Sequence, residues 1–198
     1  MSEITGKLFQ KWDLTGVTIN DKGLRQIISL TPSTGATSKG RHEHRKFGKT
    51  HVNIAERLAN SLMHFGKRHA KNTGRMAGKK YRAVNIVKTT MEMIHLKTGR
   101  NPVELLVQAV EHSSPNEDTT RIAYGGVVYH LSVDISPSRR VDLALRFISE
   151  GTRDACFNKR ISVEEALSQE IIAAANNDTA SYAIRKKNEQ ERVAMASR

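Results

Sequence analysis

Apolar residues recur at helical spacing through most of this chain, and in one stretch the spacing changes to alternation. Apolar side chains occupy every second position from Val127 to Ile135, which is the period of a β-strand. Gly125 and Gly126 separate this stretch from segment 119–124, and a two-residue glycine turn favours a hairpin. The sequence therefore predicts a two-stranded β-hairpin at about residues 119–135. It must lean on helices or on a partner, because two strands alone are marginally stable.

Signals for helix ends surround the hairpin on both sides. Asn101 and Ser162 each stand at an N-cap position, and we expect Ser136 to cap a further helix that ends at Gly151. The last segment, 179–198, has apolar residues too sparse for a core face, so we expect a terminal helix that lies along a partner. The remaining pattern predicts helices over residues 51–65, 81–98, 137–150 and 162–175, and another from residue 101 onward.

These elements indicate a mainly α fold, a helical bundle domain with an inserted two-stranded β-hairpin arm. The domain spans residues 50–198. Residues 1–49 form an N-terminal extension with a basic, flexible arm, because residues 31–48 are polar, cationic and without a period. The single Cys156 excludes an internal disulfide, and no apolar run approaches the roughly 18 residues of a membrane span. We therefore expect a soluble, cytoplasmic protein.

The positive charge of the chain is concentrated in one segment. Residues 39–82 contain thirteen Lys and Arg against two acidic residues, a net charge of +11 out of +12 for the whole protein. Such a local field attracts a polyanion better than the same charge spread evenly, so nucleic acid is the expected partner. The candidate phosphate contacts in this segment are Lys39, Arg41, Arg45, Lys46, Lys49, Lys67, Arg68, Lys71, Arg75, Lys79, Lys80 and Arg82.

The hairpin has two readings. It carries little charge, with Arg121 and His130 as its candidate cations, and this favours a purely structural arm. Tyr124 and Tyr129, however, flank the Gly125–Gly126 tip, and tyrosines exposed at a narrow tip can stack on bases or enter an RNA groove.

Two further cations follow the hairpin. Arg139 and Arg140 occupy the first turn of the next helix, where positive charge is unfavourable for the helix dipole. Their position indicates that they serve a ligand outside the helix.

The histidines do not form a metal-binding pattern, although five of the eight fall in the basic segment. No cysteine is near them, and the surrounding cations repel a metal ion. The sequence also lacks a phosphate-binding loop, a nucleophile elbow and paired catalytic carboxylates, so we expect no cofactor, metal or catalytic residue and no enzyme activity. The histidines concerned are His42, His44, His51, His64 and His69.

Two rival classes remain beside an RNA-binding protein. A DNA-bending architectural protein also combines a basic helical body with an arm, but it normally carries cations and an apolar wedge on the arm itself. A hydrolase or RNA-modifying enzyme needs a convergent acid, base or metal set, which an activity assay with and without chelator would reveal.

Several collinear runs of this chain resemble the small-subunit ribosomal protein seven family in its archaeal form, whose eukaryotic counterpart is called protein five. The resemblance covers roughly residues 50–198. It rests on VNIAERLANSLMHFGKR, AGKKYRAVNIVK, TGRNPVELLVQAVEHSSPNEDTTRI, GGVVYHLSVDISPSRRVDLALRFI and SYAIRKKNEQERVA.

The resemblance implies a non-enzymatic structural protein of the small subunit. It would bind the 3′ major domain of small-subunit rRNA, initiate assembly of the head, and contact neighbouring head and platform proteins. Lys79, Lys80, Arg139 and Arg140 would be rRNA contacts. The hairpin around Arg121, Gly125, Gly126 and Tyr129 would reach toward the exit-site tRNA and the mRNA exit. The C-terminal residues Tyr182, Arg185, Lys186 and Lys187 would face the platform side.

Overall fold

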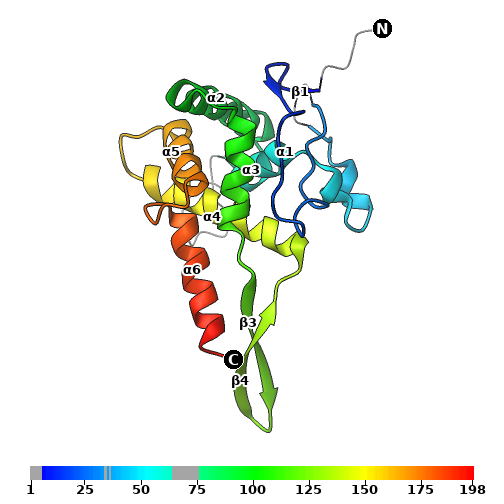
Figure 1. The fold of residues 1–198 in the computed structure, drawn as a ribbon, viewed down its shortest axis with the longest axis vertical. Coiled ribbons are helices and arrows are strands. Elements are labelled where there is room, and N and C mark those ends of the chain that lie inside the picture. Colours follow the sequence, from blue (N-terminus) through cyan, green and yellow to red (C-terminus); the bar gives the residue numbers. More distant parts are fainter. Residues whose placement is uncertain (1–5, 34, 36, 64–75) are drawn as a thin grey trace.

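The computed structural model describes residues 6–33, 35, 37–63 and 76–198, and in this part the chain is mainly helical (Figure 1). The predicted fold class is confirmed. The helices are α1 (Ile54–Leu62), α2 (Lys80–Thr98), α3 (Pro102–Ser113), α4 (Pro137–Cys156), α5 (Val163–Ala175) and α6 (Tyr182–Met195), with 3-10 helices η1 (Arg41–His44) and η2 (Gly48–His51). The strands are β1 (Lys7–Leu8), β2 (Trp12–Asp13), β3 (Glu117–Tyr124) and β4 (Val127–Asp134).

Helices α3 and α5 form the centre of the bundle. Helix α5 contacts α2, α3 and α4, so its apolar side chains meet three neighbours. The inner face of α3, with Leu106, Val107 and Val110, is fully buried. Asn101 caps this helix by accepting a hydrogen bond from the Val103 N–H, and Ser162 caps α5 through the Glu165 N–H. Both predicted caps are confirmed.

The N-terminal extension contributes to the same hydrophobic core as the helices. Leu8 and Leu24 are fully buried, and Ile28 is nearly so. The backbone N–H groups of Asn20 and Asp21 donate to the Glu111 carboxylate, at 2.7 and 3.0 Å. These contacts fix the extension along α3. The division at residues 49 and 50 stays a prediction of the sequence.

Helix α4 runs five residues beyond the predicted end at residue 151, to Cys156, so the prediction of a stop at Gly151 is wrong. A Cβ at this position would lie 2.7 Å from Tyr182 Cβ and 2.9 Å from Glu170 Oε1. The glycine therefore allows α4, α5 and α6 to approach closely, and does not end a helix. Ser136 is the N-cap residue of α4, as predicted, although its side chain accepts no capping hydrogen bond.

The first helix begins later than predicted. Its N-cap is Asn53, whose side chain accepts from the Ala55 N–H, and the residues before it belong to η2. The described helix ends at Leu62, and the predicted end at residue 65 lies outside the described residues.

The C-terminal helix packs on its own chain, which corrects the expectation that its apolar residues are too sparse for a core face. Ala183, Ile184 and Ala194 are buried, and α6 contacts α4 and β3. Near its end, Glu191 accepts from the Asn116 N–H at 2.9 Å, and Arg198 pairs with Glu117. Small alanine side chains are enough to form this buried face because α6 lies close to α4.

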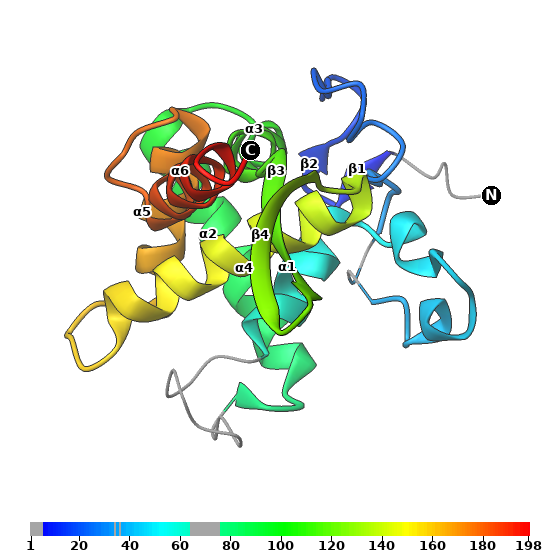
Figure 2. The same ribbon diagram turned by 90° about the horizontal axis from the view of Figure 1, so that it is seen from below.

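Strands β3 and β4 form the predicted hairpin, with Tyr124 opposite Val127 across the Gly125–Gly126 turn. Both glycines have positive φ, 58° and 83°, as a two-residue hairpin turn requires. The base of β3 is half-buried and lies beside α6, whereas the residues from 121 to 130 are all exposed. The arm projects away from the helices in Figure 1 and toward the viewer in Figure 2.

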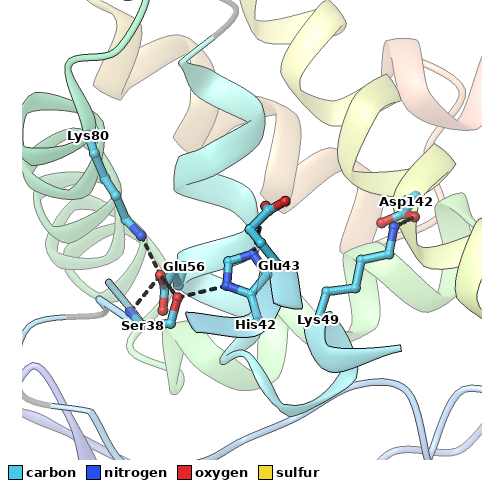
Figure 3. Close-up of polar contacts among 7 residues, drawn as sticks. All are labelled: Ser38, His42, Glu43, Lys49, Glu56, Lys80 and Asp142. Carbon is cyan, nitrogen blue, oxygen red and sulfur yellow. Dashed lines mark hydrogen bonds and ion pairs between the residues drawn. The ribbon is translucent and has the colours of Figure 1, made fainter. Parts of the chain in front are cut away.

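A buried carboxylate attaches the segment around η1 to the helices (Figure 3). Glu56 on α1 is 3% exposed, accepts from the backbone N–H and the hydroxyl of Ser38, each at 2.7 Å, and pairs with Lys80 on α2. Burial raises the pKa of Glu56, but the hydrogen bonds from Lys80 and Ser38 outweigh burial and hold it below its ordinary value. The Ser38 hydroxyl also lies 3.0 Å from His42 Nδ1 in η1.

A second ion pair attaches η2 to helix α4. Lys49 pairs with Asp142, whose other oxygen accepts from Arg57 at 2.9 Å. We call residues 38–51 the basic knuckle. Its two ends are thus held on three helices, in place of the irregular loop that the composition predicts.

Replacing Gly151 by Ala will destabilise the protein. The added methyl group meets the rigid Tyr182 Cβ, and relief of such overpacking costs up to about 3 kcal/mol, against the roughly 1 kcal/mol that Ala gains in helix propensity. Urea unfolding measures the change. Gly16→Ala is the control, because nothing lies within 4 Å of its added Cβ. An unchanged midpoint for Gly151→Ala would show that the three helices do not meet as described.

Replacing Glu56 by Gln will lower the free energy of unfolding at pH 7 by about 2–3 kcal/mol, because a largely buried Lys80 pair is broken. The folded-state pKa of Glu56 is depressed, so its contribution is present above the ordinary glutamate range and is lost as pH falls through the lowered pKa. The difference in free energy of unfolding between wild type and Glu56→Gln therefore becomes smaller in acid. Glu43→Gln, an exposed carboxylate on η1, is the control, and an equal loss there would contradict the prediction.

Candidate nucleic-acid interface

The basic knuckle carries the largest group of unpaired cations in the described chain. Lys39, Arg41, Arg45 and Lys46 are all exposed, and none makes an ion pair or a side-chain hydrogen bond with a described residue. Lys49, by contrast, is paired with Asp142. Four predicted contacts therefore have their charge directed to solvent from a backbone that is fixed at both ends.

A second group stands at the start of α2. Lys79 and Arg82 are exposed and unpaired among the described residues, and the first turn of α2 contains no acidic residue. Positive charge at a helix N-terminus is unfavourable unless an external anion compensates it. Lys80 lies between these two residues but pairs with Glu56, which joins this group to the knuckle through Ser38 (Figure 3).

Four predicted contacts lie outside the described residues. These are Lys67, Arg68, Lys71 and Arg75, which remain predictions of the sequence.

The two arginines after the hairpin differ from each other. Arg140 is 13% exposed, and it donates to Asp21 at 2.8 Å and to Ser114 at 3.1 Å. Burial raises the pKa of Asp21, but the Gly23 N–H and Arg140 outweigh it and keep this pKa below its ordinary value. Arg140 thus holds the N-terminal extension against the end of α3. Arg139 is 64% exposed and makes a longer contact, 3.4 Å, with Asp118.

The predicted hairpin residues are all exposed, and the strand register divides them between two faces. Tyr129 pairs with Ile122 and Tyr124 with Val127, so both tyrosines belong to one apolar face. Arg121 pairs with His130 on the opposite face. The arm therefore has an aromatic and aliphatic side and a weakly basic side.

The predicted C-terminal residues lie in the first two turns of α6. Tyr182 is half-buried, with its Cβ against Gly151, and Lys186 pairs with Glu189. Arg185 is exposed and Lys187 is half-exposed.

A cavity of about 220 Å³ lies under the knuckle, and both of its cations already pair with one carboxylate. Lys49 and Arg57 both pair with the Asp142 carboxylate in its wall. No group of His, Cys, Asp and Glu among the described residues is arranged to hold a metal ion. Within the same described part, no helix has the length and hydropathy needed to cross a membrane. The lining residues are His42, Lys49, Val52, Arg57, Asn60, Ser61, Asp142 and Leu145.

Two exposed aromatic residues in the basic segment were not predicted as site residues. Phe47 is 63% exposed on the knuckle, and Tyr81 is 81% exposed on α2 beside Lys79. The signal in the sequence that could have identified them is their position between cations, because an apolar side chain surrounded by charged residues has no core to enter.

Comparisons with known proteins agree with these observations. The family model described as ribosomal protein S7p/S5e matches residues 30–198. A protein of Cenarchaeum symbiosum named small ribosomal subunit protein uS7 is 60% identical over 191 residues, which cover 96% of each chain. Proteins of the same name from Methanothermobacter thermautotrophicus and Methanosphaera stadtmanae are 46% and 44% identical, each over 96% of this chain and 98% of its own. The chain therefore belongs to the ribosomal protein S7p/S5e family.

Proposed function

We propose that this protein is a structural constituent of the small ribosomal subunit that binds the 3′ major domain of small-subunit rRNA and initiates assembly of the head. Its relatives are named as small ribosomal subunit proteins, which are not enzymes. The observation that carries the proposal is the set of unpaired cations on the basic knuckle. Exposed cations can contact phosphates, and a fixed backbone holds those contacts in one geometry.

The cations act together because the knuckle and the start of α2 are joined through Glu56. Contacts to phosphates and 2′-hydroxyls depend on where the RNA backbone runs, so the protein reads shape more than base sequence. A fixed arrangement also lowers the ordering cost at binding, since the backbone that carries Arg41 and Arg45 already has a defined conformation. Lys39, Lys46, Lys79, Arg82 and Arg139 complete the proposed phosphate contacts.

The hairpin has a different proposed role. It lies near the exit-site tRNA and the mRNA exit channel, where Tyr124 and Tyr129 contact RNA bases and Arg121 contacts phosphate. The exposed residues of α6, Arg185 and Lys187, face neighbouring head and platform proteins. In this role the protein works in the cytoplasm as part of the subunit. The uncharged apolar tip favours this reading over a DNA-bending arm, which needs cations beside its wedge.

Removal of three knuckle cations will weaken binding of the rRNA fragment. The variant Arg41→Ala/Arg45→Ala/Lys46→Ala loses about one unit of salt slope for each phosphate contact removed. Fluorescence anisotropy of a folded rRNA 3′-domain fragment, titrated at several salt concentrations, measures affinity and slope. The control is Lys159→Ala/Arg160→Ala, which removes two exposed cations that pair with no described residue from the loop between α4 and α5, so the slope is compared per cation removed.

Two competitors of equal length, a duplex DNA and an unrelated structured RNA, test for shape. The rRNA fragment remains preferred as salt rises if the cations match its fold. Equal and steeply salt-dependent binding of all three would contradict the proposal and favour a general nucleic-acid binder.

Replacing Tyr124 by Ala will leave binding of the rRNA fragment unchanged and lower exit-site tRNA occupancy of assembled subunits. Loss of one stacked base corresponds to about 1–3 kcal/mol, or roughly 5-fold or more in occupancy at limiting tRNA. Val128→Ala, on the opposite face of the arm, is the control. Normal occupancy with Tyr124→Ala would contradict the proposed role of the tip.

A further inference from the structure

Phe47 combines two features that rarely occur together. Its side chain is 63% exposed, and its backbone lies in the left-handed region, with φ 59° and ψ 11°. This region is unfavourable for a bulky side chain, and an exposed ring gains little from burial in return. The position therefore costs stability in the free protein, which is typical of a residue that serves a ligand.

The strained backbone is held by contacts on both sides. The Phe47 carbonyl accepts from the N–H of Thr50 at 3.0 Å and from its hydroxyl at 2.8 Å. The Gly48 N–H donates to Arg45 O at 2.9 Å, and a Cβ on Gly48 would lie 2.3 Å from His42 O. The glycine lets η1 and η2 pack together, and this packing presents Phe47 between them.

The knuckle that presents the ring is attached to the helices. Ser38 binds Glu56 at one end and Lys49 pairs with Asp142 at the other (Figure 3). The ring is therefore displayed on a support that does not have to form when a ligand arrives, and this lowers the cost of binding.

The chemistry around the ring identifies the ligand class. Arg45 and Lys46 precede Phe47 in sequence, and the Lys46 ammonium lies 5.4 Å from the ring centroid. A protein partner with an apolar patch would have to desolvate these charges, which is costly. An RNA strand presents the opposite combination, phosphates for the cations and a flat base for the ring.

We propose that Phe47 is a stacking platform for one unpaired base of the bound RNA, while Arg41, Arg45 and Lys46 contact the phosphates that flank it. The inference rests on the proposed function and adds a single-stranded nucleotide to a surface otherwise described by phosphate contacts. A paired base inside a helix has both faces covered by its neighbours, so the ligand is a bulge, a loop or a strand end.

Tryptophan fluorescence at position 47 tests stacking directly. Trp12 is the single tryptophan, so the variant Trp12→Phe/Phe47→Trp reports from the knuckle alone. Its emission is quenched when the rRNA 3′-domain fragment binds, because a stacked base quenches indole. Trp12→Phe/Phe157→Trp is the matched reference, since Phe157 is exposed after α4 and outside the basic segment. Circular dichroism confirms that both variants keep the helices.

Affinity provides a second readout with the native tryptophan in place. Phe47→Asn removes the ring but suits the left-handed backbone, so the knuckle remains folded. It weakens binding of the fragment by about 5- to 100-fold with an unchanged salt slope, whereas Phe47→Tyr binds like wild type. An unchanged slope separates stacking from phosphate contact.

The outcomes distinguish this inference from the proposed function. Binding detected by anisotropy, without quenching at position 47 and with wild-type affinity for Phe47→Asn, would overturn the stacking platform and leave rRNA binding intact. Equal quenching by a fully paired RNA duplex would also overturn it. Failure of the wild-type protein to prefer the fragment would overturn the proposed function and this inference together.

Discussion

The buried carboxylate of Glu56 is the contact on which the basic side of this protein depends. Residues 39–82 carry thirteen cations and two acidic residues, and mutual repulsion would drive such a segment apart. One of those two acids is buried on α1, where it binds Lys80 on α2 and Ser38 at the start of the knuckle. A single negative charge inside the helices therefore brings together two cationic stretches that are distant in sequence.

The cations of this protein fall into two groups with different roles. Lys49, Arg57, Lys80 and Arg140 pair with carboxylates and hold helices, knuckle and N-terminal extension together. Lys39, Arg41, Arg45 and Lys46 have no such partner in the described chain and face solvent. Charge density in the sequence locates the region, but pairing in the fold decides which members can meet an external anion.

Features set by near neighbours in sequence were predictable, and features set by distant contacts were not. The caps at Asn101 and Ser162 and the glycine turn of the hairpin depend on a few adjacent residues, so their patterns predict them. The role of Gly151 depends on Tyr182 and Glu170, from two other helices. Lys79 and Lys80 are adjacent residues of the same type, so the sequence does not distinguish them. In the fold, Lys80 pairs with Glu56 of another helix, whereas Lys79 stays exposed. Phe47 was missed because neither its left-handed backbone nor its exposure follows from residue type.

The apolar face of the hairpin also affects the protein before it enters the small ribosomal subunit. Ile122, Tyr124 and Tyr129 are exposed on an arm whose distal strands each present a free edge among the described residues. Free edges with apolar side chains are templates for strand addition between copies, so self-association competes with assembly. The net charge of +12 opposes that contact between identical molecules and favours encounter with a polyanion. Self-association through this arm is thus a hazard for chains that have not yet met a polyanion.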